Sequence, residues 1–381
     1  MKYNLFLTYC FIFVTNTRYN EYQLPNYFVS QIVFANVYEH QYVFASSFLG
    51  KRLESNIFEI RIKMAKGKKV TVIGTGNFGS TVAFILAMNG TCHNVLLRGR
   101  NYDVTKGKAL DMSQAANAAR QHTIVKAAKG PEDMAGSDVV VITAGAPRTP
   151  GMSRDDLLLM NADIVKMYAK EIKEHAPDAV VVVVSNPLDV MTYVALKATG
   201  FPRERVLGMA GILDAARMAH FIYEKLEYGA GQIRATVMGG HGDTMVPLPK
   251  FTTVAGVPIE DLLDSEEIGE IVKKTRNGGA QIVNLLGDGS AYYAPAKSTT
   301  VMVDAILKDT NQIHSCAIML QNDYGYSDIV SGVPVMIGAG GAEQVIMMTL
   351  KNLQVKKFQN SIATVQEMVD KLYELKFFDD I

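Results

Sequence analysis

Two arginines stand on one loop of the sequence. Residues 141–156 read VITAGAPRTPGMSRDD, which places Arg148 and Arg154 six residues apart among Pro and Gly residues. A guanidinium binds a carboxylate through two parallel hydrogen bonds, and a loop that closes over a ligand brings such groups onto it. The loop follows an apolar segment that is typical of a strand, and ligands of open α/β sheets bind where strands end. The spacing therefore predicts a lid over a small substrate with two anionic groups.

A histidine and two charged residues downstream could supply chemistry beneath such a lid. Asp214 and Arg217 are three residues apart in GMAGILDAAR, so they lie on one side if this segment begins a helix. His241 is flanked by glycines in MGGHGD, which leaves its ring accessible to a ligand. Imidazole titrates near neutral pH, so His241 is a candidate for proton transfer. Taken alone, a histidine in this setting is more often structural.

The segment from residue 70 to residue 79 carries the pattern of a dinucleotide-binding turn. A β-branched segment, VTVI, is followed by GTGNFG and then by a helical pattern. The first glycine permits a tight turn, the second lets the backbone approach a pyrophosphate, and the third allows close packing of helix and strand. Free N–H groups at the helix start would bind the phosphates. The residues that this pattern assigns to the cofactor are Gly74, Gly76, Asn77, Phe78 and Gly79.

Apolar segments alternate with helical ones beyond this turn. Residues 95–97, 139–142 and 180–185 are near-continuous apolar runs, typical of parallel strands buried on both faces. Helical patterns over residues 109–120 and 157–174 lie between them, which is the order of a Rossmann domain. We therefore predict an α/β fold, with a Rossmann-type doubly wound parallel sheet followed by an α+β substrate-binding and catalytic domain.

The end of the second predicted strand departs from the fingerprint of NAD-binding domains. An acid about 20 residues past the glycines normally bonds the ribose hydroxyls, but residues 94–101 read NVLLRGRN and contain no Asp or Glu. Arg98 and Arg100 flank Gly99 there, and they would attract the 2′-phosphate of NADP. The sequence predicts that NADP is used as well as NAD or better. The alternative is an exposed strand end that is basic by chance.

Composition limits the class of protein. The chain has 381 residues, enough for two domains, and its 38 basic residues balance 38 acidic ones. The overall charge therefore favours neither nucleic acid nor a membrane surface as a partner. The three cysteines, Cys10, Cys92 and Cys316, are far apart, which argues against a disulfide framework and against a metal cluster. This pattern favours reduced thiols in a cytoplasmic protein.

The first 63 residues differ in composition from the rest of the chain. They hold 15 of the 33 Phe and Tyr residues but only one of the 31 glycines, with neither strand alternation nor helical spacing. Residues 5–14 imitate a signal-peptide core but lack its flanking features, and they are too short to span a bilayer. A targeting signal remains the alternative. We predict an atypical extension outside the fold over residues 1–63, a dinucleotide-binding domain over 64–207 and a substrate domain over 208–381.

Together these motifs resemble the lactate/malate dehydrogenase family, and most closely its bacterial lactate-dehydrogenase-like malate dehydrogenases. The resemblance runs from about residue 68 to residue 369, and the motifs follow the family's order. It implies transfer of a hydride between a 2-hydroxy acid and C4 of a nicotinamide, the chemistry being that of bound NAD or NADP. It also implies a homodimer or a homotetramer.

The resemblance assigns a role to each candidate residue. His241 is the implied proton donor and acceptor, and Asp214 holds its imidazole and balances its charge. Arg217 binds the first carboxylate of the substrate, and Arg154 polarises the substrate carbonyl when the lid closes. Two asparagines complete the implied site, one at the reacting oxygen beside the cofactor and one at the cofactor itself: Asn186 and Asn161.

Arg148 decides the expected substrate. The family has Arg at this lid position in malate dehydrogenases and Gln in lactate dehydrogenases. Oxaloacetate carries a second carboxylate that needs a cation, whereas pyruvate carries a methyl group, so Arg148 favours interconversion of (S)-malate and oxaloacetate. The alternatives are a lactate dehydrogenase and a non-catalytic dinucleotide-binding protein on the same fold.

Overall fold

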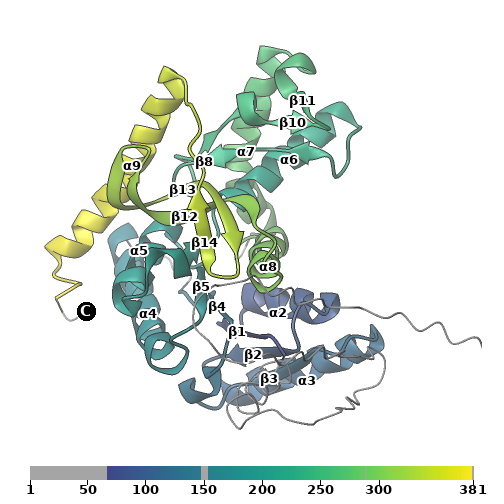
Figure 1. The fold of residues 1–381 in the computed structure, drawn as a ribbon, viewed down its shortest axis with the longest axis vertical. Coiled ribbons are helices and arrows are strands. Elements are labelled where there is room, and N and C mark those ends of the chain that lie inside the picture. The colour runs from purple at the N-terminus through teal and green to yellow at the C-terminus, as the bar shows by residue number, and fades with distance from the viewer. Residues whose placement is uncertain (1–66, 147–152, 288, 380–381) are drawn as a thin grey trace, which may run out of the picture. The chain divides into compact units, whose positions relative to one another are not determined.

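A computed structural model describes residues 67–379 of the chain, apart from 147–152 and 288 (Figure 1). The predicted extension over residues 1–63 lies outside the described residues, and so does Arg148 of the predicted lid. The fold therefore tests neither of these two predictions.

A nine-stranded sheet runs through the described residues in the order β14-β13-β12-β6-β5-β4-β1-β2-β3. The six strands from β1 to β6 are parallel, and β1 lies between β2 and β4. They are β1 (Lys69–Ile73), β2 (Asn94–Arg98), β3 (Ile124–Ala127), β4 (Val139–Ile142), β5 (Val180–Val183) and β6 (Val206–Gly208). The order 3-2-1-4-5-6 is that of a doubly wound dinucleotide-binding sheet. The predicted Rossmann-type fold class is confirmed.

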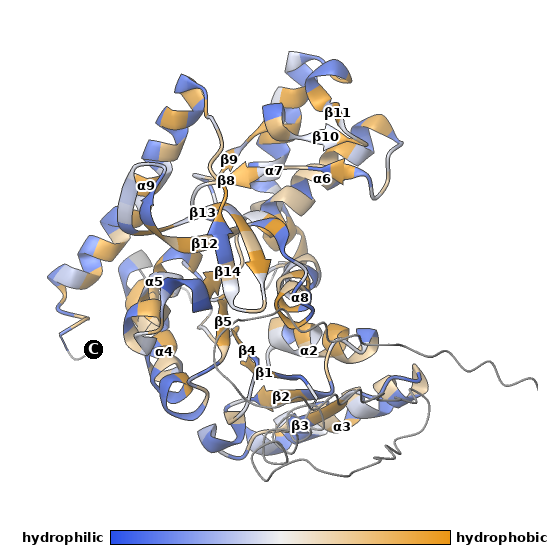
Figure 2. Ribbon diagram, viewed as in Figure 1, coloured by the Kyte–Doolittle hydropathy of each residue, from blue (hydrophilic) through white to orange (hydrophobic). Residues whose placement is uncertain are grey.

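Helices cover both faces of this sheet (Figure 1). α2 packs against α3 and α8 on one face, while α4 packs against α5 on the other. These helices are α2 (Asn77–Asn89), α3 (Tyr102–Ala118), α4 (Arg154–His175), α5 (Leu188–Thr199) and α8 (Tyr293–Leu307). Figure 2 shows apolar residues on the central strands and polar residues on the outer helix surfaces. Within the described part of the chain, no helix is both long enough and apolar enough to cross a bilayer.

The second half of the chain extends the same sheet. The strands β12 (Gln312–Asp323), β13 (Tyr326–Gly338) and β14 (Gly341–Val345) are antiparallel, and β12 joins β6 through the pair of Ala317 and Gly208. Apolar residues of both halves form one main core, and the whole from Gly67 onward is one compact unit. The predicted boundary between residues 207 and 208 therefore falls inside a shared sheet, and it stays a prediction.

A smaller layer carries the loop of His241. Helix α6 (Gly211–Leu226) packs against α7 (Ser265–Leu286) over a second apolar core, and α9 (Asn352–Glu374) packs against β13. Five short strands lie between α6 and α7 in the chain: β7 (Ile233–Arg234), β8 (Val237–Met238), β9 (Val246–Pro247), β10 (Thr253–Val254) and β11 (Val257–Pro258). Single 3-10 turns lie at Pro131–Met134, Arg203–Arg205, Pro249–Phe251 and Ile259–Asp261.

The predicted phosphate-binding turn joins β1 to α2. Gly74 has a φ of 97°, a conformation that other residues rarely adopt. A Cβ on Gly79 would overlap the carbonyl oxygen of Gly74, so helix and strand approach too closely for any side chain. A Cβ on Gly76 would meet no protein atom within 4 Å. The geometry matches the packing expected of the first and third glycines and leaves open space at the second.

Gly79→Ala is expected to destabilise the fold by about 1–3 kcal/mol, the usual cost of overpacking, because the new Cβ displaces backbone. Gly107→Ala in α3 is the matched control, since a Cβ there meets nothing within 4 Å. Alanine in that helix should stabilise by roughly 0.5–1 kcal/mol. Urea unfolding of both variants measures the difference, and a Gly79→Ala protein as stable as the wild type would contradict the close approach.

Candidate active site

Three of the predicted catalytic residues come together in the structure. Asp214 and Arg217 lie in the first turns of α6, and His241 lies in the loop after β8. His241 Nδ1 is 3.0 Å from Asp214 Oδ2, and Arg217 Nη1 donates to Asp214 Oδ1 over 3.3 Å. Asp214 is 1% exposed, whereas the side chains of His241 and Arg217 are 16% and 14% exposed. The shared carboxylate therefore lies beneath two groups that a ligand can reach.

Asp214 changes how readily His241 takes up a proton. Burial by itself lowers the pKa of His241, but the charge and the hydrogen bond of Asp214 raise it, and Asp189 adds to the rise. These effects outweigh burial and the nearby Arg217 charge, so the pKa of His241 lies above its ordinary value of 6.5. The protonated form is favoured, as a group that donates a proton near neutral pH requires.

The loop of His241 is fixed by its backbone. The His241 N–H donates to Asp189 Oδ2 over 2.8 Å, and the Gly240 N–H donates to Ser361 Oγ over 2.7 Å. Asp189 lies in the first turn of α5 and Ser361 lies in α9, so two distant helices hold one short loop. The sequence analysis named Asn186 in the segment SNPLD but not Asp189, with which the segment ends. The available signal was a carboxylate a few residues after a buried strand.

Arg217 packs against a pair of glycines in α7. A Cβ on Gly279 would lie 3.4 Å from Arg217 Nη2, and one on Gly278 would lie 3.4 Å from its Cδ. The Nε of Arg217 is buried and has no hydrogen-bond partner among the described residues. An unpartnered guanidinium donor is costly unless a ligand satisfies it. The sequence signal that was missed is a Gly-Gly pair in the middle of a helix, where glycine is otherwise unfavourable.

One of the predicted asparagines, Asn161, bridges the loops that follow β4 and β5. Asn161 Oδ1 accepts from the Ala146 N–H over 2.7 Å, and Asn161 Nδ2 donates to the backbone oxygen of Asn186 over 2.8 Å. The side chain of Asn186 is exposed. The side-chain amide of Asn161 is thus engaged inside the protein, and it connects the residue before the predicted lid to the loop after β5.

The second lid arginine is placed by a helix start. Ser153 Oγ accepts from the Asp156 N–H over 3.0 Å, and Asp156 Oδ2 accepts from the Ser153 N–H over 3.1 Å. This capping box begins α4 at Arg154. The side chain of Arg154 is outside the described part of the structure.

The cofactor turn is open at the start of α2. No side chain caps this helix, so the N–H groups at Asn77, Phe78 and Gly79 are available for an anion. Lys108 of α3, which sequence reasoning missed, donates from Nζ to the Thr75 carbonyl over 2.6 Å and contacts Ser80 Oγ at 3.2 Å. Lys108 thus holds the turn through Thr75 and Ser80 and adds a positive charge beside it. These residues fit a dinucleotide pyrophosphate.

The expectation that Arg98 is free for a 2′-phosphate is wrong. Its Nη2 lies 3.1 Å from Glu171 Oε1 and its Nε lies 3.4 Å from Glu171 Oε2, so one edge of the guanidinium is paired with α4. Arg100 is exposed. Gly99 is buried, and a Cβ on it would overlap Thr105 Oγ1 and lie 2.5 Å from Thr75 Oγ1. Of the two arginines, Arg100 is exposed, whereas Arg98 is partly buried against α4.

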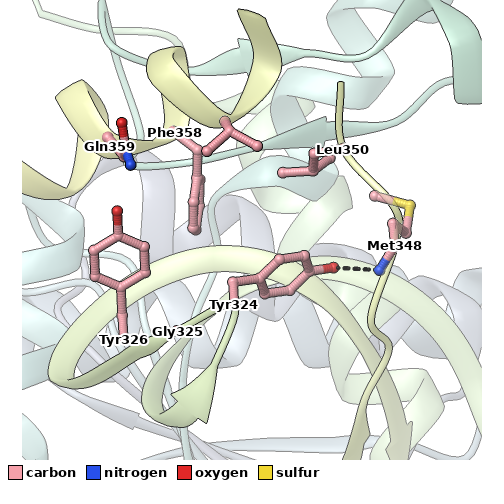
Figure 3. Close-up of a pocket in the computed structure, with 8 residues that line it drawn as sticks. Tyr324, Gly325, Tyr326, Met348, Leu350, Phe358 and Gln359 are labelled. Carbon is pink, nitrogen blue, oxygen red and sulfur yellow. Dashed lines mark hydrogen bonds between the residues drawn. The ribbon is translucent and has the colours of Figure 1, made fainter. Parts of the chain in front are cut away.

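A separate pocket of about 390 Å³ lies between the β12–β13 turn and the start of α9 (Figure 3). Tyr324 anchors it, because its hydroxyl donates to the Ile346 carbonyl over 2.7 Å and accepts from the Met348 N–H over 3.0 Å. Aromatic and aliphatic side chains make up most of the remaining lining, including Tyr326, Leu350 and Phe358. Its lining has no charged group for a dicarboxylate, and none of the predicted site residues lines it.

The sheet order, the glycine turn and the His–Asp–Arg cluster define an α/β oxidoreductase that binds a dinucleotide. Comparison with known families gives two matches that together cover most of the chain. The lactate/malate dehydrogenase NAD binding domain matches residues 68–208, and the lactate/malate dehydrogenase alpha/beta C-terminal domain matches residues 212–376. The chain belongs to the lactate/malate dehydrogenase family, as its motifs indicated.

Individual relatives agree with this assignment. The chain is 60% identical to the malate dehydrogenase of Sulfurimonas denitrificans over 316 residues, which are 83% of this chain and 99% of that protein. It is 56% identical to that of Nitratiruptor sp. over 83% of this chain and all of that one. The solved malate dehydrogenase of Salinibacter ruber matches with a TM-score of 0.77 and 43% identity, over 81% of this chain and 98% of that one. The lactate dehydrogenase of Eimeria maxima with NADH and oxamate matches with a TM-score of 0.78 and 34% identity, over 82% and 96%.

Asp214→Asn is expected to lower the pKa of His241, because the amide can still accept a hydrogen bond but carries no charge. The raised pKa stabilises the wild type below the unfolded value of 6.5, and this contribution is lost as pH rises through the folded pKa. The wild type should therefore exceed the variant in melting temperature by more at about pH 6 than at about pH 9. Ring-proton NMR titration and thermal melts measure both effects.

Glu224→Gln is the control for this titration. It removes the partner of His220 in an exposed pair, Glu224 Oε1 being 3.3 Å from His220 Nε2, and it leaves the buried pair intact. The His241 titration should not move in Glu224→Gln. The role given to Asp214 is wrong if the titration is also unmoved in Asp214→Asn.

Proposed function

We propose that this protein interconverts (S)-malate and oxaloacetate with a nicotinamide dinucleotide. The observation that carries the proposal is the cluster of His241, Asp214 and Arg217, in which a buried guanidinium nitrogen lacks a partner among the described residues. A substrate carboxylate would bind the guanidinium of Arg217, whose side chain is 14% exposed, beside an imidazole that favours its protonated form. The relatives named malate dehydrogenase at 60% and 56% identity support the same activity.

His241 transfers the proton through one ring nitrogen. Nδ1 is engaged by Asp214, so Nε2 is the nitrogen left for the substrate oxygen. In malate oxidation the neutral ring accepts the hydroxyl proton at Nε2, and Asp214 balances the resulting charge. In oxaloacetate reduction the protonated ring returns that proton to the carbonyl oxygen. The nicotinamide, when bound, supplies the hydride chemistry.

Arg217 orients the substrate for this transfer. Its Nη1 is held by Asp214, and its contact with Gly278 and Gly279 fixes the plane of the guanidinium. A carboxylate bound to the remaining donors would be held near His241, because both side chains share the carboxylate of Asp214. Asn186, held at its backbone by Asn161, would bond the reacting oxygen.

The lid arginines complete the proposed site. Arg154 begins α4, where it would reach the substrate carbonyl when the preceding loop closes and excludes water. Arg148 would bind the distal carboxylate that distinguishes oxaloacetate from pyruvate. A lactate dehydrogenase is the second candidate, because lactate dehydrogenases are among the structural relatives.

The substrate proposal is tested by the loss of reduced-nicotinamide absorbance with oxaloacetate or pyruvate. We expect the wild type to prefer oxaloacetate, and Arg148→Gln to reduce the ratio of the two kcat/KM values about tenfold or more, the worth of a hydrogen bond to a charged group. His241→Asn is the control, since it should abolish turnover while coenzyme binding, followed by fluorescence, persists. A wild type that prefers pyruvate identifies a lactate dehydrogenase, and an unchanged ratio removes Arg148 as the selector.

We also propose that NADP is accepted alongside NAD. The sequence offered two arginines for the 2′-phosphate, but Glu171 pairs with Arg98. Arg100 is left as the exposed cation beside the buried Gly99. The absence of an acid over residues 94–101 removes a group that would repel a 2′-phosphate.

Arg100→Gln is expected to lower kcat/KM for NADPH several-fold, by about one exposed charge-assisted contact, and to leave NADH nearly unchanged. Glu171→Gln should act in the opposite direction for NADPH, because it releases Arg98. Steady-state kinetics with both coenzymes give the result, with NADH as the internal control. A wild type that strongly prefers NADH, and whose NADPH rate ignores both substitutions, would refute the proposal.

A further inference from the structure

A second buried carboxylate lies beside the catalytic pair, and the proton transfer derived above does not use it. Asp189 is 3% exposed, and its Oδ2 accepts the His241 N–H over 2.8 Å. Its Oδ1 is buried and has no partner within the part of the chain that the structure describes. A buried charged oxygen without a partner costs stability. Buried ionisable groups of this kind cluster at functional sites, where they tune the reacting groups.

The charges around His241 come from two helices. Asp214 and Arg217 face it from α6, and Asp189 faces it from α5. The loop contact from α9 is the uncharged hydroxyl of Ser361. Asp189 is therefore the one described group that both anchors the His241 backbone and carries a charge.

We propose that Asp189 is a positioning residue for proton transfer, fixing the His241 loop through its backbone N–H and placing a second negative charge beside the His241–Asp214 pair. The inference rests on the proposed role of His241. Asp189 touches neither the reacting atoms nor the imidazole ring in this scheme, and it acts through the placement and protonation of His241.

This role predicts a gain in stability when the charge is removed. Burial raises the pKa of Asp189 from 3.8 to about 6, although the hydrogen bond and the charge of His241 oppose the rise. Stability is therefore fully present below the unfolded value of 3.8 and is lost as pH rises through about 6. Asp189→Asn should melt at a higher temperature than the wild type at about pH 8, and the difference should vanish near pH 4.

The same variant should change the pH dependence of activity. Asparagine keeps an acceptor for the His241 N–H but removes one of the two negative charges that raise the pKa of His241, the larger effect being that of Asp214. The falling limb of the kcat/KM profile for oxaloacetate reduction, which requires protonated His241, should move to lower pH. Asp189→Ala also removes the anchor, and it should lose on the order of tenfold to a hundredfold in kcat/KM at every pH.

Ser361→Ala is the matched control, because it removes an uncharged anchor of the same loop. It should lower kcat/KM without moving the pH profile. A profile that is unmoved in Asp189→Asn overturns the charge role, and full activity in Asp189→Ala overturns the positioning role. An Asp189→Asn protein that is less stable than the wild type at about pH 8 marks a purely structural residue.

These outcomes are separable from failure of the proposed function. If the wild type does not reduce oxaloacetate, or if His241→Asn remains active, the proposed function fails whatever Asp189 does. If both tests of the function succeed and the Asp189 variants behave like the wild type, only this inference fails.

Discussion

The buried carboxylate of Asp214 is the group on which the rest of the site depends. Removing a carboxylate from water costs several kcal/mol unless partners offset the loss. Asp214 has two such partners, with His241 Nδ1 at 3.0 Å and Arg217 Nη1 at 3.3 Å. A single charge at the start of α6 therefore fixes the tautomer of the imidazole and one edge of the guanidinium. The proton-transfer group and the carboxylate-binding group are thereby held in one geometry before any substrate arrives.

The surroundings of this carboxylate leave little room for the loop of His241 to shift. A Cβ on Gly240 would lie 3.1 Å from Val365 Cγ2 and 3.3 Å from Asp189 Oδ2. The last helix of the chain therefore packs directly against the catalytic loop, although more than a hundred residues separate them in sequence. Helix α9, which lies within the family match to residue 376, therefore contacts a site whose charged residues end at His241.

The features that the sequence predicts are those set by residues close together in the chain. The glycine turn, the order of strands and the pairing of Asp214 with Arg217 follow from short patterns whose spacing has a physical meaning. Sequence reasoning did not recover Asp189 at His241, or Glu171 at Arg98, because each contact joins residues at least 52 positions apart. Arg98 shows the risk of such reasoning. A basic strand end looks available for a ligand until the fold brings an acid from another helix to it.

The continuous sheet has a mechanical consequence. From β3 to β14 the strands are hydrogen-bonded neighbours, and the main core is shared by both halves of the chain. A hinge between the two halves would break the junction of β6 with β12 and divide that core, which is too costly to accompany every turnover. The two halves therefore do not close on a ligand as separate domains, and ligand access depends on loops at the edge of the sheet. Closure of such segments over a ligand typically takes microseconds to milliseconds.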